Sequence, residues 1–153
     1  MREVRLAADA SDRSAAYAVR YDVFVTEQHV PADMELDALD ETAEHFVAYD
    51  DGQAVGAGRL VVEPTGFEGA DPALGPVGHL GRLAVRPHVR GTALGVALVR
   101  AVEERAAARG LRLVVLAAQT HATGFYERLG YTAYGGVFDD AGLPHRWMRK
   151  TLG

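Results

Sequence analysis

The most informative part of the chain is residues 81–95, which read Gly81-Arg82-Leu83-Ala84-Val85-Arg86-Pro87-His88-Val89-Arg90-Gly91-Thr92-Ala93-Leu94-Gly95. Residues 83–85 are a short apolar run of the kind that forms a buried strand. Pro87 ends this strand, because proline has no backbone N–H to donate to a neighbouring strand. Beyond the turn, apolar residues recur at helical spacing and predict one amphipathic helix that ends at Gly110: Leu94, Ala97, Leu98, Ala101 and Val102.

The turn before this helix has the chemistry of an anion site. Gly91 and Gly95 are small enough to let a ligand approach the backbone, and the unpaired N–H groups of a helix N-terminus attract negative charge. Arg90 adds a full positive charge. Together these features predict a pyrophosphate site, although glycines at a helix start often serve only close packing.

Length and composition limit the classes of protein to which the chain can belong. Its 153 residues, 48% of them hydrophobic, predict one domain over residues 1–153 with a single core. The absence of cysteine excludes disulfides and thiolate chemistry and suits a reducing compartment. No apolar run approaches the roughly 20 residues of a membrane span, and the first residues carry no signal-peptide core. We therefore expect a cytoplasmic protein without a membrane partner.

Charge is unevenly distributed along the chain. The net charge of −5 argues against a nucleic-acid partner, although 15 of the 16 basic residues are arginine and these concentrate after residue 82. Between residues 27 and 44 there is no Lys or Arg but there are seven acids: Glu27, Asp33, Glu35, Asp37, Asp40, Glu41 and Glu44. They predict either a solvated acidic surface or a wall that attracts a cationic amine.

The rest of the chain alternates between expected strands and helices. Strands are expected at residues 4–7, 45–49, 54–63, 111–117, 131–139 and 145–152, and further helices at 11–24, 34–42 and 122–129. The order is β-α-α-β-β-β-α-β-α-β-β, which predicts an α/β fold with a mixed sheet and helices on both faces.

Several local signals refine this outline. Ser11 is the expected N-cap of the first helix, which carries one apolar stripe through Val19 and a second through Tyr21, so that we expect it to be mostly buried. An Asp-Gly step at residues 51–52 favours a tight hairpin. Gly56 and Gly58 mark either a bulge or a place of close packing. The loop over residues 64–77 has no periodicity, and its Phe67 could cover a substrate or plug the edge of the core.

Two stretches of this chain resemble motifs of the GNAT superfamily of N-acetyltransferases. Residues 90–95, Arg-Gly-Thr-Ala-Leu-Gly, resemble the family's Arg/Gln-x-x-Gly-x-Gly/Ala turn, which binds the pyrophosphate of acetyl-CoA. Ala93 stands where the family usually has glycine, and its methyl group is tolerable if its φ is negative. Residues 125–131, Phe-Tyr-Glu-Arg-Leu-Gly-Tyr, resemble the end of a second family motif. Residues 119–121 and 142–145 add a resemblance to the ElaA-like subgroup, which extends over nearly the whole chain.

The resemblance implies roles for particular residues. Tyr126 would protonate the departing CoA thiolate, unless it is simply a core tyrosine. His79 occupies the usual position of a general base, and an unperturbed histidine pKa of about 6.5 suits that role, with His45, His145 and Glu35 as rivals. Cofactor contacts are expected at Leu83, Ala84, Val85, Arg90, Gly91, Thr92, Ala93, Leu94, Gly95, Gln119 and Tyr126. Substrate contacts are expected at Glu27, Glu35, Asp37, His45 and His145.

The expected reaction transfers the acetyl group of acetyl-CoA to a primary amine of a small molecule or peptide. Direct attack by the amine needs neither a metal nor a covalent intermediate, so we expect no metal site. One alternative is a catalytically silent acyl-CoA-binding or sensing module. A remoter one is an enzyme like the acyl-homoserine lactone synthases, which share the fold but lack the Arg-x-x-Gly-x-Gly turn. The oligomeric state stays open, and a homodimer is one possibility.

Overall fold

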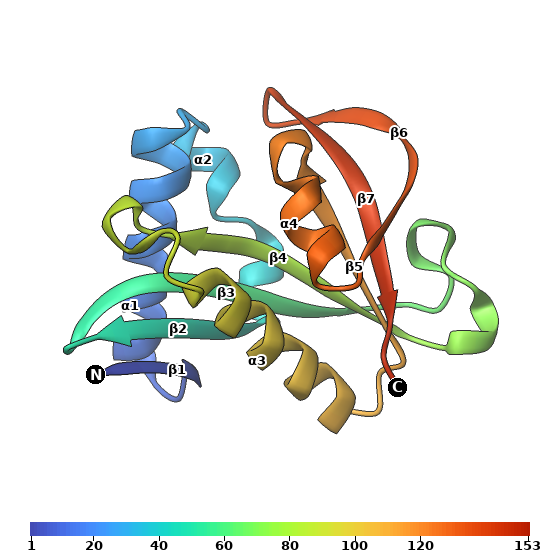
Figure 1. The fold of residues 1–153 in the computed structure, drawn as a ribbon, viewed down its shortest axis with the longest axis horizontal. Coiled ribbons are helices and arrows are strands. Elements are labelled where there is room, and N and C mark those ends of the chain that lie inside the picture. The colour runs from blue at the N-terminus through green and yellow to red at the C-terminus, as the bar shows by residue number, and fades with distance from the viewer. The chain divides into compact units, whose positions relative to one another are not determined.

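The computed structural model describes residues 1–153, and its elements follow one another in the expected order (Figure 1). The strands are β1 (Arg2–Leu6), β2 (Glu44–Asp50), β3 (Gln53–Glu63), β4 (Val77–Val85), β5 (Leu113–Gln119), β6 (Thr132–Asp140) and β7 (Leu143–Thr151). The α-helices are α1 (Ala10–Arg20), α2 (Ala32–Glu35), α3 (Leu94–Ala108) and α4 (Thr123–Arg128). The predicted order β-α-α-β-β-β-α-β-α-β-β and the α/β class are confirmed.

The chain forms two compact units, and β3, β4 and α3 each contribute to both of them. The first unit comprises Met1–Val61 and Leu80–Glu104, and its strands run in the order β1-β2-β3-β4. The second comprises Val62–His79 and Arg105–Gly153, and its strands run in the order β4-β5-β7-β6. The single domain expected over residues 1–153 stays a prediction. None of the helices combines the length and the apolar character that crossing a membrane requires.

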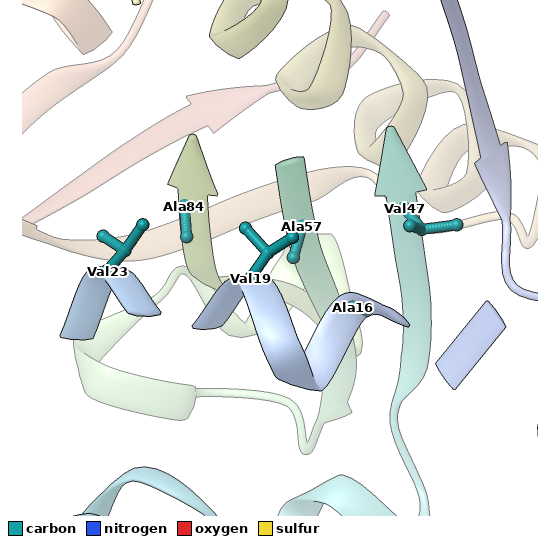
Figure 2. Packing of buried hydrophobic residues seen from close by; sticks show 6 residues of the cluster. All are labelled: Ala16, Val19, Val23, Val47, Ala57 and Ala84. Carbon is teal, nitrogen blue, oxygen red and sulfur yellow. The ribbon is translucent and has the colours of Figure 1, made fainter. Parts of the chain in front are cut away.

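One face of the first unit's strands is covered by α1 and by the π-helix Tyr21–Glu27 that continues it. Figure 2 shows the apolar side chains that meet there, all at most 3% exposed: Ala16, Val19, Val23, Val47, Ala57 and Ala84. The predicted first stripe is therefore confirmed. The second stripe is not wholly buried, because Tyr21 is 52% exposed. The chain changes there from α- to π-helical winding, so that residues four apart no longer share one face.

The opposite face of β3 packs against α3. Successive side chains of a strand point to opposite faces, so Gly56 and Ala57 lie on different sides. A Cβ atom on Gly56 would lie 2.8 Å from Leu98 Cδ1 and 3.1 Å from Ala48 Cβ. Glycine at this position therefore allows the close approach of α3, as one of the two sequence-based interpretations expects. In the first unit, helices cover both faces of the strands.

Two expected helix boundaries are wrong. The N-cap of α1 is Asp9 rather than Ser11, and its side chain accepts a hydrogen bond of 2.9 Å from the N–H of Asp12. Aspartate caps a helix as well as serine does, so residue type alone could not decide between them. The helix expected over residues 34–42 is broken into α2 and a 3₁₀-helix, Ala38–Glu41, because Asp37 and Asp40 form a capping box that starts a new helix.

The hairpins form as the sequence predicts. Residues 51 and 52 have φ of 49° and 82° in the turn between β2 and β3, which pair antiparallel, and β6 and β7 also pair antiparallel. In the loop before β4, Phe67 packs against a second-unit core of Ala70, Val77, Leu113 and Val115. This contact favours the interpretation that Phe67 plugs the edge of the core.

Candidate active site

The turn between β4 and α3 presents exposed, left-handed backbone. β4 ends at Val85 and α3 begins at Leu94. Between them, Gly91 has φ of 78° and Ala93 has φ of 66°, and residues 91–93 are exposed. Left-handed residues at alternating positions of a turn direct successive N–H groups into a concavity that suits an anion. A Cβ atom on Gly91 would meet nothing within 4 Å, so the backbone there is open to a ligand. These features fit a diphosphate group.

Ala93 does not meet the condition under which its methyl group is tolerable. The sequence-based interpretation requires a negative φ, whereas the φ of Ala93 is 66°. A left-handed conformation costs a residue with a Cβ atom about 1–2 kcal/mol, and costs glycine almost nothing. The turn therefore holds its left-handed backbone with strain at Ala93.

The side chains of the other motif residues are turned into the protein or brace the turn. Ala84 and Leu94 are buried, and Leu83, Val85 and Gly95 are half-buried. Thr92 donates its hydroxyl to the carbonyl of Val89, and its own carbonyl accepts a bond of 3.1 Å from Arg2. The side chain of Thr92 thus braces the turn.

Arg90 is held in place by a carboxylate. Its two terminal nitrogens each lie 2.7 Å from an oxygen of Glu27, and its Nε donates to the carbonyl of Val85 at 3.0 Å. Hydrogen bonds from Arg90 hold the pKa of Glu27 below its usual value. A second ion pair joins Arg86 to Asp22. Ion pairs near both ends of the π-helix Tyr21–Glu27 therefore connect it to the turn. Glu27 was expected to bind the substrate amine, but it is instead the partner of Arg90, the residue predicted to bind the pyrophosphate.

A buried charge network occupies the region where the acidic wall was expected. Arg20 binds Glu35 and Asp40, each at a shortest distance of 2.7 Å. Arg59 binds Asp37 at 2.8 Å and Asp40 at 3.0 Å. Arg82 binds Glu35 at 3.0 Å and Asp37 at 3.2 Å. The three arginines balance the three carboxylates, so this set carries no net charge.

These ion pairs contradict the expectation that the carboxylates of Glu27, Glu35, Asp37 and Asp40 form an acidic surface that attracts an amine, because each of them is already paired with an arginine. The arginines come from outside the acidic stretch, which is why its composition alone misled. Burial by itself would raise the pKa of Asp40, but hydrogen bonds from Arg20 and from the N–H of Asp37 hold that pKa well below its usual range. The carboxylate is ionised and neutralised within the protein.

His45 lies next to this network and has a structural environment. It is buried, its Nε2 lies 2.9 Å from the carbonyl of Asp40, and the ring of Tyr17 meets it edge-on at 5.2 Å. Only a protonated ring nitrogen can bond to a carbonyl, so Nε2 carries the proton. Its Nδ1 is buried without a hydrogen-bond partner. The imidazole thus has no accessible nitrogen with which to receive a proton from a substrate.

In the second unit, His79 forms a pair with Glu63, a residue that the sequence-based interpretation missed. His79 Nδ1 lies 3.0 Å from Glu63 Oε2, and the two side chains are 16% and 15% exposed. The rings of Phe67 and Trp147 lie 5.2 and 5.8 Å from the imidazole. A proton on Nδ1 shared with the carboxylate makes Nε2 the basic nitrogen of the ring. An acid at the end of a largely apolar strand was the only sequence signal for Glu63.

Tyr126 lies on α4 among other aromatic rings. It is 8% exposed, and the rings of Phe125 and Tyr131 lie edge-on at 5.0 and 5.9 Å. Burial raises the pKa of Tyr126 well above its usual value. The phenol therefore stays protonated at neutral pH, as a proton donor must be.

The other two predicted site residues of the second unit, Gln119 and His145, lie opposite each other on neighbouring strands. Gln119 of β5 is paired in register with His145 of β7. Gln119 Oε1 accepts a bond of 2.7 Å from His121, and His145 Nδ1 donates to the carbonyl of Leu143 at 2.8 Å. His145 is also buried and stacks on Phe138. The structure brings these two residues together.

Comparisons with known proteins agree with this fold. A family model described as an acetyltransferase (GNAT) domain matches residues 6–152. The "Uncharacterized N-acetyltransferase YjcF" of Bacillus subtilis (strain 168) is 39% identical over 136 residues, which cover 88% of this chain and 89% of YjcF. A solved acyl-CoA N-acyltransferase from Pseudomonas aeruginosa is 29% identical and has a TM-score of 0.79 over 98% of each chain.

ElaA of Escherichia coli (strain K12) is also similar. It is 28% identical over 140 residues, which cover 90% of this chain and 86% of ElaA. The crystal structure of ElaA has a TM-score of 0.78 at 24% identity and covers 98% of this chain and 99% of its own. The family model extends over nearly the whole chain, and the chain therefore belongs to the GNAT family and is an acyltransferase.

Proposed function

We propose that the chain transfers the acetyl group of acetyl-CoA to a primary amine of a small molecule or peptide. The observation that carries this proposal is the exposed left-handed turn that follows β4, with Arg90 beside it, in a member of an acyltransferase family. The names of two relatives support the proposed donor and bond: the Pseudomonas protein is called an acyl-CoA N-acyltransferase, and YjcF an uncharacterized N-acetyltransferase. A chain without cysteine favours action in the cytoplasm.

Arg90 and the backbone of residues 91–93 hold the pyrophosphate in this proposal. The backbone of Leu83, Ala84 and Val85, the start of α3 at Leu94 and Gly95, and the side chain of Gln119 complete the binding of acetyl-CoA. Binding through backbone N–H groups and one guanidinium depends on the charge of the pyrophosphate. Since that charge does not change in the reaction, the contacts of Arg90 and of residues 91–93 act on affinity rather than on the chemical step.

The reaction is a direct displacement. His79, oriented by Glu63, accepts a proton from the amine, and the amine nitrogen forms a bond with the thioester carbonyl carbon. The C–S bond breaks, its electron pair leaves with sulfur, and Tyr126 gives the thiolate a proton. Backbone N–H groups of β4 polarise the carbonyl oxygen as its negative charge develops. Glu35, Asp37 and Glu27 are paired with arginine, so we assign the ammonium of the substrate to none of them.

A thiol-release assay over a panel of primary amines tests the proposal. With acetyl-CoA, at least one amine is expected to increase the release of free CoA and to appear in acetylated form by mass spectrometry. The rate is expected to depend on both substrates with intersecting initial-velocity patterns. Binding of acetyl-CoA by calorimetry without turnover on any amine would instead identify a sensing module. An acetylated protein that transfers its acetyl group to the amine would contradict direct attack.

A further inference from the structure

A left-handed residue interrupts β4 just before the motif. Arg82 lies within Val77–Val85 and has φ of 52°. A left-handed residue other than glycine is strained and persists only where its surroundings hold it. Inside a strand, such a residue breaks the regular alternation of the backbone and re-aims the groups that follow it. The residues that follow are 83–85, whose backbone takes part in the proposed reaction.

The side chain of Arg82 is fixed by four acceptors. Its Nε donates to Glu35 Oε2 at 3.0 Å and to the Glu35 carbonyl at 3.1 Å. Its Nη2 donates to Asp37 Oδ2 at 3.2 Å and to the Met34 carbonyl at 3.4 Å. All of these acceptors lie on one short segment, residues 34–37, which includes the end of α2. The guanidinium is thus directed at this segment through its Nε and Nη2.

The same segment is anchored from two other elements. Arg20 of α1 binds Glu35 through both Nε and Nη2, and Arg59 of β3 binds Asp37. Arg20 and Arg59 are buried, and so are Glu35 and Asp40, to which they are joined. A buried network in which each carboxylate is hydrogen-bonded to two arginines rigidifies the groups that it joins. Glu35 is therefore fixed within the buried part of the network, and Asp37, which is exposed, is held by its ion pair with Arg59.

We infer that Arg82 is a positioning residue: its ion pairs with Glu35 and Asp37 hold β4 in the left-handed conformation that sets the backbone direction of residues 83–85, and with it the β4 N–H that is proposed to polarise the thioester carbonyl. This inference rests on the proposed function. Arg82 acts through the strand backbone and makes no contact of its own with the substrate. It differs in this from Arg90, whose charge is proposed to bind the cofactor.

Two substitutions at the same position test the inference. Arg82→Ala removes the ion pairs and leaves a residue that disfavours positive φ, whereas Arg82→Gly removes the same ion pairs but adopts positive φ freely. We expect Arg82→Ala to lower kcat by about 100-fold, the size of effect seen when an oxyanion donor is lost, with the Kd for acetyl-CoA changed by less than about threefold. The kcat of Arg82→Gly is expected to be at least about tenfold higher than that of Arg82→Ala. The matched control Arg13→Ala, at an exposed site on α1, should leave kcat unchanged.

The measurements are made at a temperature where circular dichroism shows each variant folded. A folded Arg82→Ala protein with the kcat of the parent would show that Arg82 only stabilises the fold. Equal losses in the alanine and glycine variants would show that the guanidinium itself acts on the substrate. The amide NMR signals of residues 83–85 give a second readout that needs no turnover, since they should shift more in the alanine variant than in the glycine variant. If the parent protein acetylates no amine, the proposed function is wrong. The amide NMR signals of residues 83–85 would still test whether Arg82 sets the conformation of β4.

Discussion

The backbone of Ala93 has a left-handed conformation, which costs an L-residue with a Cβ atom about 1–2 kcal/mol. Ala93 precedes α3, which begins at Leu94, so glycine at position 93 loses no helix propensity. We expect Ala93→Gly to raise the free energy of unfolding by about 1 kcal/mol, measured by urea denaturation. Its affinity for acetyl-CoA should be equal to that of the parent or tighter.

Ala97→Gly is the matched control for this substitution. Ala97 is an exposed residue inside the same helix, where glycine costs about 1 kcal/mol relative to alanine. The two alanine-to-glycine changes should therefore shift the free energy of unfolding in opposite directions. Equal destabilisation by both would contradict the left-handed conformation at Ala93.

The role proposed for Tyr126 is confined to one chemical step. The departing thiolate acquires a charge that it lacks in the thioester, so a phenol that donates to sulfur stabilises the transition state more than the ground state. We expect Tyr126→Phe to lower kcat and kcat/KM together by about 10- to 1000-fold, and to change stability by less than about 1 kcal/mol. Tyr134→Phe, which removes the hydroxyl of a half-buried tyrosine on β6, should leave kcat unchanged.

The pKa of Tyr126 also predicts the shape of the alkaline pH profile. A general acid works only while it is protonated, so its activity is lost as the pH rises through its pKa. Burial raises the pKa of Tyr126 above its usual value of about 10. No decline of kcat caused by Tyr126 is therefore expected up to about pH 10. Full activity of Tyr126→Phe, or a loss that merely follows unfolding, would contradict the assignment.

At the scale of elements, the turn after β4 is expected to bind the cofactor without taking part in the chemistry. Arg90→Ala should raise the KM for acetyl-CoA by about tenfold or more with little change in kcat, because the pyrophosphate keeps its charge throughout the reaction. Arg100→Ala, which removes an exposed arginine from α3, should change neither constant. An unchanged KM in Arg90→Ala would place the pyrophosphate elsewhere.

Arg90→Ala also removes the partner of Glu27, and a second variant separates the two effects. Glu27→Gln breaks the ion pair but keeps the guanidinium, which is then released from a competing carboxylate. The KM for acetyl-CoA should be unchanged or lower in this variant. A rise as large as that of Arg90→Ala would show that the ion pair, rather than the arginine alone, shapes the site.

Local signals explain which elements could be predicted from the sequence. Pro87 ends β4, the Asp-Gly step at residues 51–52 makes a hairpin, and Gly110 follows the end of α3 with φ of 78°. Each of these residues acts on its own neighbours, so its effect can be read without knowledge of the fold. The N-cap of α1 was missed because Asp9 and Ser11 are equally good caps only two residues apart.

Long-range pairing explains what could not be predicted. Arg20 binds a carboxylate 15 residues away, and Arg82 binds the same carboxylate across 47 residues. No spacing rule connects such partners, so the acidic stretch looked unpaired. The conformation of Ala93 was hidden for a different reason, since alanine has no preference for positive φ and only the surrounding turn imposes it.

At the scale of the whole molecule, the charge network should contribute strongly to stability. Arg20→Ala leaves Glu35 and Asp40 buried with fewer positive partners, and breaking a buried ion pair in this way costs about 3–5 kcal/mol. Urea denaturation at neutral pH measures this loss. Arg13→Ala, on the exposed side of the same helix, should stay within about 0.5 kcal/mol of the parent. A similar small effect for Arg20→Ala would show that the network does not hold the fold.

The same network predicts how stability depends on acid. In the folded protein the pKa of Asp40 is lowered, so its contribution is present above the unfolded pKa of about 3.9 and is lost as the pH falls through the lower folded pKa. In the parent, the free energy of unfolding should therefore fall steeply below about pH 4. In Arg20→Ala that fall should be shallower, because one cause of the lowered pKa is gone. An equally steep fall in both proteins would assign the acid sensitivity to other groups.

The fate of the acetyl group distinguishes direct transfer to the amine from transfer through the protein and from hydrolysis. Isotopically labelled acetyl-CoA is mixed with the chain and with an amine that supports thiol release, and the label is followed by mass spectrometry in the amine, in the free acid and on the protein. Direct transfer to an amine predicts one labelled amine for each CoA released, with no labelled protein that later passes its label on. Label that first accumulates on the protein and then moves to the amine would contradict direct transfer, and so would CoA release that yields only free acetate.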